Sequence, residues 1–219
     1  RELILSETTG TPVHIAHVSL SLSVELIRHA KARGVPVTCE TCPHYFTLTD
    51  EACDGFNTLA KVNPPLAGRE DVEAIIMGLS DGTIDMIATD HAPHHKDEKD
   101  CEFAQAANGL IGFESAFPLA YTHLIRTGIL TLPQLIQKMS LNPSRFLKLQ
   151  KGILAPGNAA DLIVADLETP YVLDVARFHS KSKNTPFHGY PVYGRILGTF
   201  TGGRQVYVFS EEGGFACCS

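Results

Sequence analysis

The feature that most constrains the fold of this chain is the alternation of strand-like and helix-like segments up to about residue 150. Short apolar runs typical of buried strands lie at 13–18, 35–40 and 84–89. Stretches with the helical spacing of apolar side chains lie at 21–33, 72–79 and 132–139. Strands that alternate with helices of this length predict parallel βα units, in a barrel or in a doubly wound sheet.

Helix-start signals are clearest in the third helical stretch. Thr131 and Gln134 have the spacing of a capping box, in which each side chain satisfies a backbone amide of the first turn. Asn142 and Pro143 then predict a separate short helix, with Asn142 as its N-cap and Pro143 at its first position.

The pattern changes after Gly152. Apolar, strand-like runs lie at 161–165, 195–201 and 204–209, and Gly202-Gly203 has the form of a two-residue hairpin turn. The predicted organisation is an α/β part at 1–151, a small β-sandwich-like module at 152–210 and a loose tail at 211–219.

Composition excludes several classes of protein. The chain has 219 residues, of which 44% are hydrophobic and 19% charged, so it is neither disordered nor fibrous. Its net charge of −6, without a cluster of Lys and Arg, argues against nucleic acid or an anionic membrane as partner. No apolar run approaches the roughly 18 residues of a membrane span, and no signal-peptide pattern opens the chain. We expect a cytoplasmic protein.

Two local motifs have plain structural interpretations. Cys39 and Cys42 form a CxxC pair, but a zinc ribbon needs a second pair, and the sequence holds none. We therefore expect buried or half-buried reduced thiols, as in an intracellular protein. The charge run at 96–100 predicts a solvated loop.

Polar residues that could carry chemistry follow the three predicted strands. His17 ends the first strand, His44 follows the second, and the run Asp90 to His95 ends the third. Because parallel βα proteins place active sites at the carboxyl ends of their strands, these side chains are expected to converge on one rim. Imidazole and carboxylate ligands suit Zn²⁺ in an open catalytic site, but spacing alone does not assign a role to each histidine.

Six segments carry a resemblance to a known family. They are HIAHVS (14–19), ETCPHYFTLT (40–49), KVNPPL (61–66), IATDHAPH (87–94), NGLIGFESAFPL (108–119) and SKSKNTPFHG (180–189). Together they resemble the bacterial dihydroorotases, which are metal-dependent amidohydrolases, over about residues 11–209. The resemblance implies the last part of a (β/α)₈ TIM-type barrel, strands six to eight, followed by a small β module.

The resemblance also implies roles for individual residues. His17 matches a zinc ligand at the end of strand six, and Asp90 matches the strand-eight aspartate that is both metal ligand and general acid/base. Asn63 and His94 match side chains that hold the substrate ring and its carboxylate. Asn108-Gly109 matches a segment whose backbone contacts the pyrimidine. The implied cofactor is Zn²⁺, with two ions in a full-length enzyme.

Other positions depart from the family pattern or lack a role in it. His44 is not a usual metal ligand, and we interpret it as supporting the site or as structural. Ala67 stands where an arginine often follows the NPPL run, with Arg69 two positions on. The HxHxR segment, the bridging aspartate or carboxylated lysine and the strand-five histidine have no counterpart here. We therefore expect a C-terminal fragment that is inactive alone.

The resemblance implies interconversion of (S)-dihydroorotate and N-carbamoyl-L-aspartate in pyrimidine biosynthesis. One alternative is another cyclic amidohydrolase, a dihydropyrimidinase or an allantoinase, which differs because it does not bind the dihydroorotate carboxylate. The other is a non-catalytic homologue that acts as a structural partner of aspartate carbamoyltransferase. A homodimer or an association with that transferase is implied as well.

Overall fold

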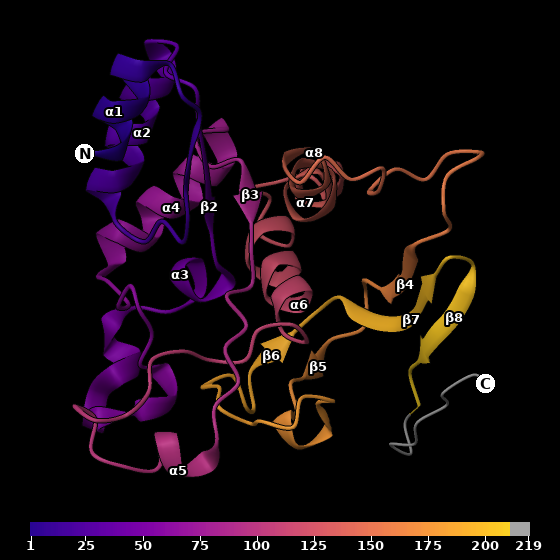
Figure 1. The fold of residues 1–219 in the computed structure, drawn as a ribbon. Helices are drawn as coiled ribbons and strands as arrows, with labels where there is room; N and C mark the ends of the chain where they lie inside the picture. The colour runs from indigo at the N-terminus through magenta and orange to yellow at the C-terminus, as the bar shows by residue number, and fades with distance from the viewer. Residues whose placement is uncertain (211–219) are drawn as a thin grey trace.

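The computed structural model describes residues 1–210 as an α/β part followed by a group of antiparallel strands (Figure 1). The first half of the α/β part contains α1 (Glu2–Thr9), β1 (Val13–Ile15), α2 (Ser21–Ala32), β2 (Val37–Thr41), α3 (Pro43–Thr47), η1 (Asp50–Phe56), η2 (Thr58–Ala60), α4 (Arg69–Asp81) and β3 (Met86–Ile87). Its second half contains α5 (Lys96–Lys99), α6 (Ala116–Ala120), η3 (Tyr121–Ile125), α7 (Leu132–Ile136), η4 (Gln137–Leu141) and α8 (Asn142–Phe146).

The three strands of the α/β part form one parallel sheet in the order β1-β2-β3. His14 pairs with Thr38 across β1 and β2, and Thr41 pairs with Ile87 across β2 and β3. Parallel pairing brings the three carboxyl ends to the same edge of the sheet, as the alternating pattern predicts.

Helices α2 and α4 cover one side of this sheet because each carries an apolar stripe. Ile27 of α2 and Ile75 and Leu79 of α4 lie in the main core. Val37 and Cys39 of β2 belong to the same apolar cluster. Burying an aliphatic side chain of this size contributes about 1.5–3 kcal/mol, so the stripes hold the helices in place. Gly82 ends α4 with a left-handed φ of 84°, which a glycine adopts without strain.

The strands themselves are shorter than the apolar runs predict. β1 ends at residue 15 of the expected 13–18, and β3 covers two residues of the expected 84–89. The chain leaves the ladder because His17 and Asp90 take positive φ values, 41° and 48°, which no strand accommodates. Each turn falls directly where a polar group was expected at a strand end.

The capping box at Thr131 and Gln134 is present, and the Thr131 amide donates to Gln134 Oε1 at 2.8 Å. The prediction of Asn142 as an N-cap is wrong. Its φ and ψ are helical, −65° and −45°, and the helical backbone continues from α7 through η4 into α8. The Asn142 side chain instead donates to the Asp85 carbonyl at 2.8 Å. The widened turn of η4 precedes Pro143, which has no amide to continue an ordinary helical turn.

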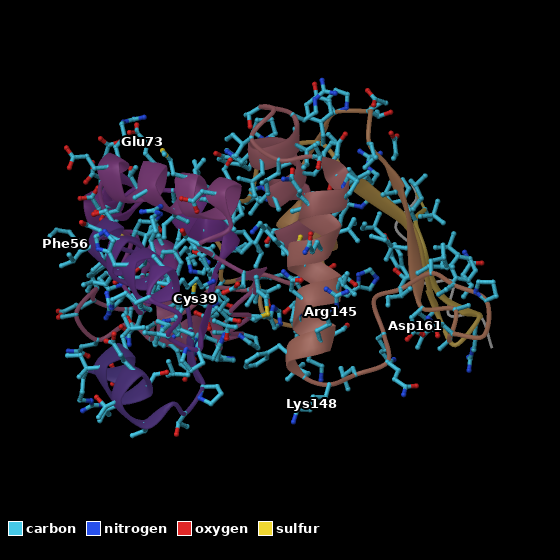
Figure 2. All side chains as sticks on the ribbon, turned by 90° about the horizontal axis from the view of Figure 1, so that it is seen from above. Cys39, Phe56, Glu73, Arg145, Lys148 and Asp161 are labelled. Carbon is cyan, nitrogen blue, oxygen red and sulfur yellow. The ribbon has the colours of Figure 1, made fainter. Side chains whose placement is uncertain are left out.

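Cys39 and Cys42 lie in the interior, both with 0% exposure. Figure 2 shows Cys39 inside the α/β part, while Phe56 and Glu73 lie at its outer boundary. Burial raises the pKa of the Cys39 thiol to about 11, so the thiol stays protonated at neutral pH. Both cysteines are free thiols, which agrees with the expectation from their spacing.

The later part of the chain contains β4 (Leu162–Asp166), β5 (Tyr171–Val172), η5 (Val175–Arg177), β6 (Pro191–Val192), β7 (Arg195–Thr201) and β8 (Arg204–Val208). β4, β7 and β8 form an antiparallel sheet, and β5 pairs with β6. Gly202 and Gly203 form the predicted β7–β8 turn, with φ values of 58° and 81°.

This later part packs on α6, because Leu119 shares an apolar cluster with Leu173, Phe187 and Val192. A long connection leads from α8 to β4 (Figure 1). The tail predicted at 211–219 lies outside the described residues. In the described range, no helix combines the length and the apolarity that a membrane span requires.

Candidate active site

His17 and Asp90 stand at the carboxyl edge of the parallel sheet, directly after β1 and β3. Both side chains are exposed, and both residues have left-handed backbone conformations. A non-glycine residue in this region of φ costs roughly 1–2 kcal/mol, and such residues gather at functional sites. One imidazole and one carboxylate are therefore open to solvent at the ends of β1 and β3.

The end of β2 lies between them. His44, on the short helix α3, is 1% exposed, and burial, followed by the nearby His17, lowers its pKa to about 3. Burial followed by the negative charge of Asp90 raises the pKa of Cys42. Burial, Cys42 and Asp90 together raise the pKa of Tyr45. His17 and Asp90 follow β1 and β3, which flank β2 in the parallel sheet, so both residues lie at the same edge of the sheet.

His44 is held neutral inside this rim. Its ring lies 4.1 Å from the Tyr45 ring, and its buried Nε2 has no hydrogen-bond partner. A buried imidazole nitrogen without a partner is uncommon and favours a role in supporting the site over a purely structural one.

Asn63 reaches the same region on the loop between η2 and α4. Its side chain is exposed, and the Asn63–Pro64 peptide bond is cis. Tyr45 Oη donates to the Pro64 carbonyl at 2.7 Å, which fixes this loop against α3. The Lys61 carbonyl accepts from the Gly109 amide at 2.9 Å, which joins the same loop to the segment after β3.

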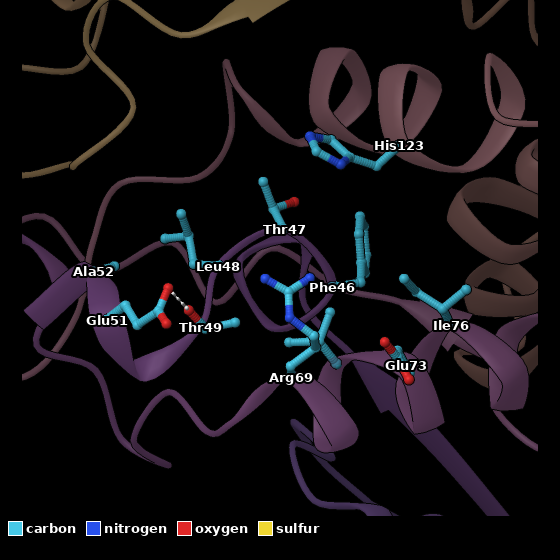
Figure 3. Close-up of a pocket in the computed structure, with 11 residues that line it drawn as sticks. Phe46, Thr47, Leu48, Thr49, Glu51, Ala52, Arg69, Glu73, Ile76 and His123 are labelled. Carbon is cyan, nitrogen blue, oxygen red and sulfur yellow. Dashed lines mark hydrogen bonds between the residues drawn. The ribbon is translucent and has the colours of Figure 1, made fainter.

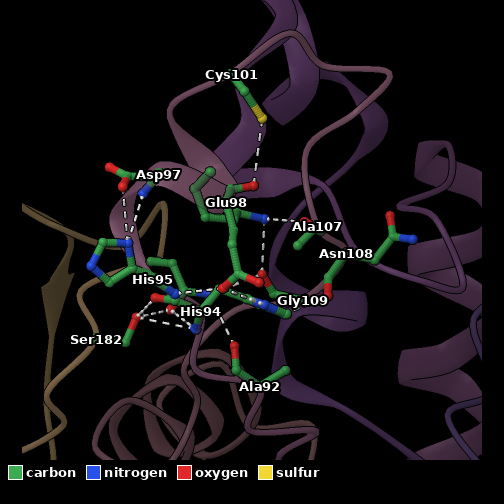
Figure 4. Close-up of polar contacts among 12 residues, drawn as sticks. Ala92, His94, His95, Asp97, Glu98, Cys101, Ala107, Asn108, Gly109 and Ser182 are labelled. Carbon is green, nitrogen blue, oxygen red and sulfur yellow. Dashed lines mark hydrogen bonds and ion pairs between the residues drawn. The ribbon is translucent and has the colours of Figure 1, made fainter.

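His94, Asn108 and Gly109 are in direct contact (Figure 4). His94 Nε2 donates to the Asn108 carbonyl at 2.9 Å, and His94 Nδ1 lies 3.6 Å from a Glu98 carboxylate oxygen. The Ala92 amide donates to the Leu110 carbonyl at 2.9 Å, so the two segments run side by side. The structure thus joins His94, Asn108 and Gly109 directly, and the Asn63 loop to them through Lys61. Within the described residues, no hydrogen bond or ion pair links His17 or Asp90 to this group.

Gly109 is required where these two segments meet. Its φ is 126°, and a Cβ at this position would lie 2.6 Å from the Ala92 Cβ and 3.2 Å from His94 Nε2. Only a residue without a side chain allows so close an approach of two backbones.

The expectation of a solvated loop at 96–100 is wrong for Lys99. This residue is 4% exposed, and its Nζ donates to the Ala107 carbonyl at 2.7 Å and to the Gly109 carbonyl at 3.0 Å. The three N–H donors of its ammonium group face carbonyl groups instead of water. The charge run therefore includes a residue that holds the Asn108-Gly109 segment. Three other side chains missed from the sequence are Lys61, Ser182 and Asn184, whose backbone-directed contacts have no local sequence pattern.

The fit to a metal rests on donor chemistry. His17 and Asp90 offer an imidazole nitrogen and carboxylate oxygens, the ligand types of a catalytic zinc. No cluster of three or more His, Cys, Asp or Glu side chains placed to hold a metal ion occurs within residues 1–210. The residues present fit zinc as part of a ligand set.

A separate hollow of about 520 Å³ lies between α3, α4 and η3 (Figure 3). Arg69, Glu73 and His123 are among its lining residues, and none of the predicted site residues lines it. The hollow and the rim at the strand ends are therefore different places on the molecule.

Comparison with known proteins places this geometry in a family. A model of the amidohydrolase family matches residues 3–206, nearly the whole chain. The chain belongs to the amidohydrolase family. The amidohydrolase chain is also similar to curated dihydroorotases: it is 62% identical over 94% of its length to one from Acetivibrio thermocellus, and 60% identical over 94% to one from Ruminiclostridium cellulolyticum. In both comparisons it spans 48% of the relative, about half the length.

Solved structures of related amidohydrolases share its fold. An L-hydantoinase (dihydropyrimidinase) from Arthrobacter aurescens superposes with a TM-score of 0.89 at 32% identity, over 96% of this chain and 49% of the other. A D-hydantoinase (dihydropyrimidinase) from a Thermus species gives 0.87 at 26% identity, over 96% and 49%.

Proposed function

We propose that this amidohydrolase chain is the C-terminal part of a dihydroorotase, which hydrolyses the cyclic amide of (S)-dihydroorotate to N-carbamoyl-L-aspartate in pyrimidine biosynthesis. The observation that carries the proposal is the 62% identity to a curated dihydroorotase over 94% of the chain. In the proposed full-length protein, β1 to β3 are strands six to eight of a (β/α)₈ barrel, residues 1–151 belong to that barrel, and residues 152–210 form a small β module.

In this proposal His17 and Asp90 hold zinc, together with ligands from outside the chain, because catalytic zinc normally has three protein ligands. Zinc bound there would lower the pKa of a water molecule and polarise a carbonyl group. Asp90, at the rim, accepts a proton from the attacking water and returns it to the ring nitrogen that leaves. The exposure of its side chain supports this role, because a buried carboxylate could not meet the substrate.

Asn63, His94 and Asn108-Gly109 hold the substrate in the proposed reaction. The His94 imidazole donates to the carboxylate of dihydroorotate, and Asn63 donates to the ring from the opposite loop. The fixed loops support this role, because the Tyr45–Pro64 and Lys61–Gly109 hydrogen bonds limit their movement. Binding to a pre-positioned set of groups lowers the entropic cost of reaching the reactive geometry.

The test is hydrolysis of (S)-dihydroorotate by the full-length protein that carries these residues, loaded with zinc. Asp90→Asn keeps the size of the side chain but removes the proton acceptor, and we expect a loss of kcat of at least about 100-fold. Asp54→Asn, at an exposed position on η1, is the matched control and keeps wild-type turnover. Equal turnover by the two variants would refute the role of Asp90.

A second candidate is a hydantoinase or dihydropyrimidinase activity, favoured by the 0.89 TM-score to the Arthrobacter enzyme. The same assay with hydantoin and dihydrouracil separates the two, because these substrates lack the carboxylate that His94 binds in our proposal. Faster turnover of either one than of dihydroorotate would favour this alternative. Absence of all three reactions in the zinc-loaded protein would favour the non-catalytic homologue.

A further inference from the structure

The segment between η5 and β6 is fixed to the α/β part at its start. The Glu114 carboxylate, just before α6, accepts hydrogen bonds from the His179 amide at 2.8 Å and from the Ser180 amide at 3.0 Å. It also accepts from His179 Nδ1 at 3.0 Å. Hydrogen bonds to a charged acceptor are stronger than those between neutral groups, so the start of this segment has a defined position beside α6.

Asn184 makes the most extensive contact of this segment with the candidate site. It is 4% exposed, and its Nδ2 donates to the Ala92 carbonyl at 2.9 Å and to the Gly109 carbonyl at 3.1 Å. Its Oδ1 accepts from the His94 amide at 3.2 Å, and its own carbonyl accepts from the Ile111 amide at 3.0 Å. One buried amide group thus joins the two segments that carry His94 and Gly109.

Ser182 adds a second contact to the same loop (Figure 4). Its Oγ donates to the His94 carbonyl at 2.5 Å, and the His94 amide lies 3.3 Å from the same oxygen. Ser182 Oγ also contacts Asn184 Oδ1. The backbone of His94 is therefore held on both its amide and its carbonyl by one short segment of the later part of the chain.

We propose that Asn184 and Ser182 are positioning residues that set His94 and Asn108-Gly109 for binding of the substrate carboxylate. The inference rests on the proposed dihydroorotase function, in which His94 meets that carboxylate. Neither residue touches the substrate. Each acts through the backbone of His94 or Gly109, and Lys99, which also donates to the Gly109 carbonyl, supports the same arrangement from the other side.

The expected kinetic effect follows from where the carboxylate lies. It is remote from the amide bond that breaks, so its binding stabilises the bound substrate and the transition state alike. Loss of such uniform binding raises KM and leaves kcat nearly unchanged. Removing the Asn184 side chain takes a donor from the Ala92 carbonyl and one of two side-chain donors from the Gly109 carbonyl, whose other donor is Lys99. The two segments are then held less firmly in the arrangement that binds the carboxylate, and ordering them on binding costs affinity. A tenfold rise in KM corresponds to a loss of about 1.4 kcal/mol of binding free energy.

The experiment uses the zinc-loaded full-length protein with the variants Asn184→Ala, Ser182→Ala and Ser182→Thr. Lys181→Ala is the matched control, because Lys181 lies in the same segment with an exposed side chain. We expect Asn184→Ala to raise the KM for dihydroorotate about tenfold with kcat within about threefold. Ser182→Ala is expected to give a smaller rise in KM. Ser182→Thr, which keeps the hydroxyl group, and Lys181→Ala are expected to have the wild-type KM.

Hydrogen exchange of the His94 and Ile111 amides gives a readout that does not depend on activity. The His94 amide donates to the Asn184 side chain, so it should exchange faster in Asn184→Ala and at the wild-type rate in Lys181→Ala. The Ile111 amide donates to the Asn184 backbone carbonyl, which alanine keeps, so its exchange serves as an internal control. An unchanged KM in an active Asn184→Ala variant would overturn the proposal. If Asn184→Ala does not fold, the Ser182 variants decide: an equal KM in Ser182→Ala and Ser182→Thr would overturn it. A wild-type protein without dihydroorotase activity would refute the proposed function instead. In that case, unchanged exchange of the His94 amide in Asn184→Ala would also overturn the positioning contact.

Discussion

Replacing Gly109 by alanine tests the close approach of the two loops at the candidate site. The added Cβ would lie 2.6 Å from the Ala92 Cβ, a separation that real Cβ atoms essentially never show, and the φ of 126° would be retained only with strain. Gly34→Ala is the matched control, because Gly34 has a φ of 80° and nothing within 4 Å of the added atom.

The two substitutions separate backbone strain from the steric clash. A positive φ in a non-glycine residue costs about 1–2 kcal/mol, which is the expected loss for Gly34→Ala. Overpacking adds about 1–3 kcal/mol, so Gly109→Ala should lose about 2–5 kcal/mol. Against a total stability of about 5–15 kcal/mol, that loss is large. The added atom would also lie 3.2 Å from His94 Nε2, so KM for dihydroorotate should rise in Gly109→Ala alone.

The assay is urea denaturation of the full-length variants, compared at the unfolding midpoint, together with KM for dihydroorotate. A Gly109→Ala protein as stable as Gly34→Ala, with wild-type KM, would show that the two loops separate easily. In that case the contact between Gly109 and Ala92 would have no part in shaping the site.

Three further results are expected. Burial raises the pKa of Cys39 to about 11, above the roughly 8.5 of an unfolded thiol, so the contribution of the buried neutral thiol to stability should be complete below about pH 8.5 and decline as the pH rises towards 11. The free energy of unfolding should therefore fall more steeply with pH in the wild type than in Cys39→Ala. Parallel curves for the two proteins would contradict this. Lys138→Met should cost about 1–3 kcal/mol in urea denaturation, because Nζ of this buried lysine donates to the Ile84 carbonyl at 2.6 Å, whereas Lys148→Met at an exposed position should change little. Residues 1–219 expressed alone with zinc should not hydrolyse dihydroorotate, since His17 and Asp90 are fewer ligands than catalytic zinc normally has; turnover above roughly 1 per second would refute this.

The parallel sheet and its helices were predictable because they follow from local periodicity. The helical faces of α2 and α4 and the capping box at Thr131 depend on residues within a few positions of one another. The prediction failed at Asn142, where the side chain finds the Asp85 carbonyl 57 residues away. A partner so distant in sequence leaves no mark on the local pattern.

In the candidate site, too, the locally determined features were predicted and the long-range contacts were not. His17 and Asp90 were expected at strand ends, and the structure places them there with left-handed turns that shorten β1 and β3. Lys99 was misjudged because a charge run normally faces solvent, whereas the carbonyl groups that bury its Nζ come from a loop whose path the sequence does not reveal. Asn184 was missed for the same reason.

The distance in sequence between Asn184 and its partners also sets an order of events during synthesis. Asn184 is 75 residues beyond Gly109 and 92 beyond Ala92. A ribosome that adds about 5–20 residues per second therefore delivers the loop roughly 4–18 s before the side chain that joins its two segments. During that interval the nascent chain can already form the strand ends that carry His17 and Asp90, with Lys99 as the side-chain donor to the Gly109 carbonyl and water as partner of the Ala92 carbonyl. Chains released early, before residue 184, would keep His17 and Asp90 but lack the Asn184 side chain that joins the segments of Ala92 and Gly109.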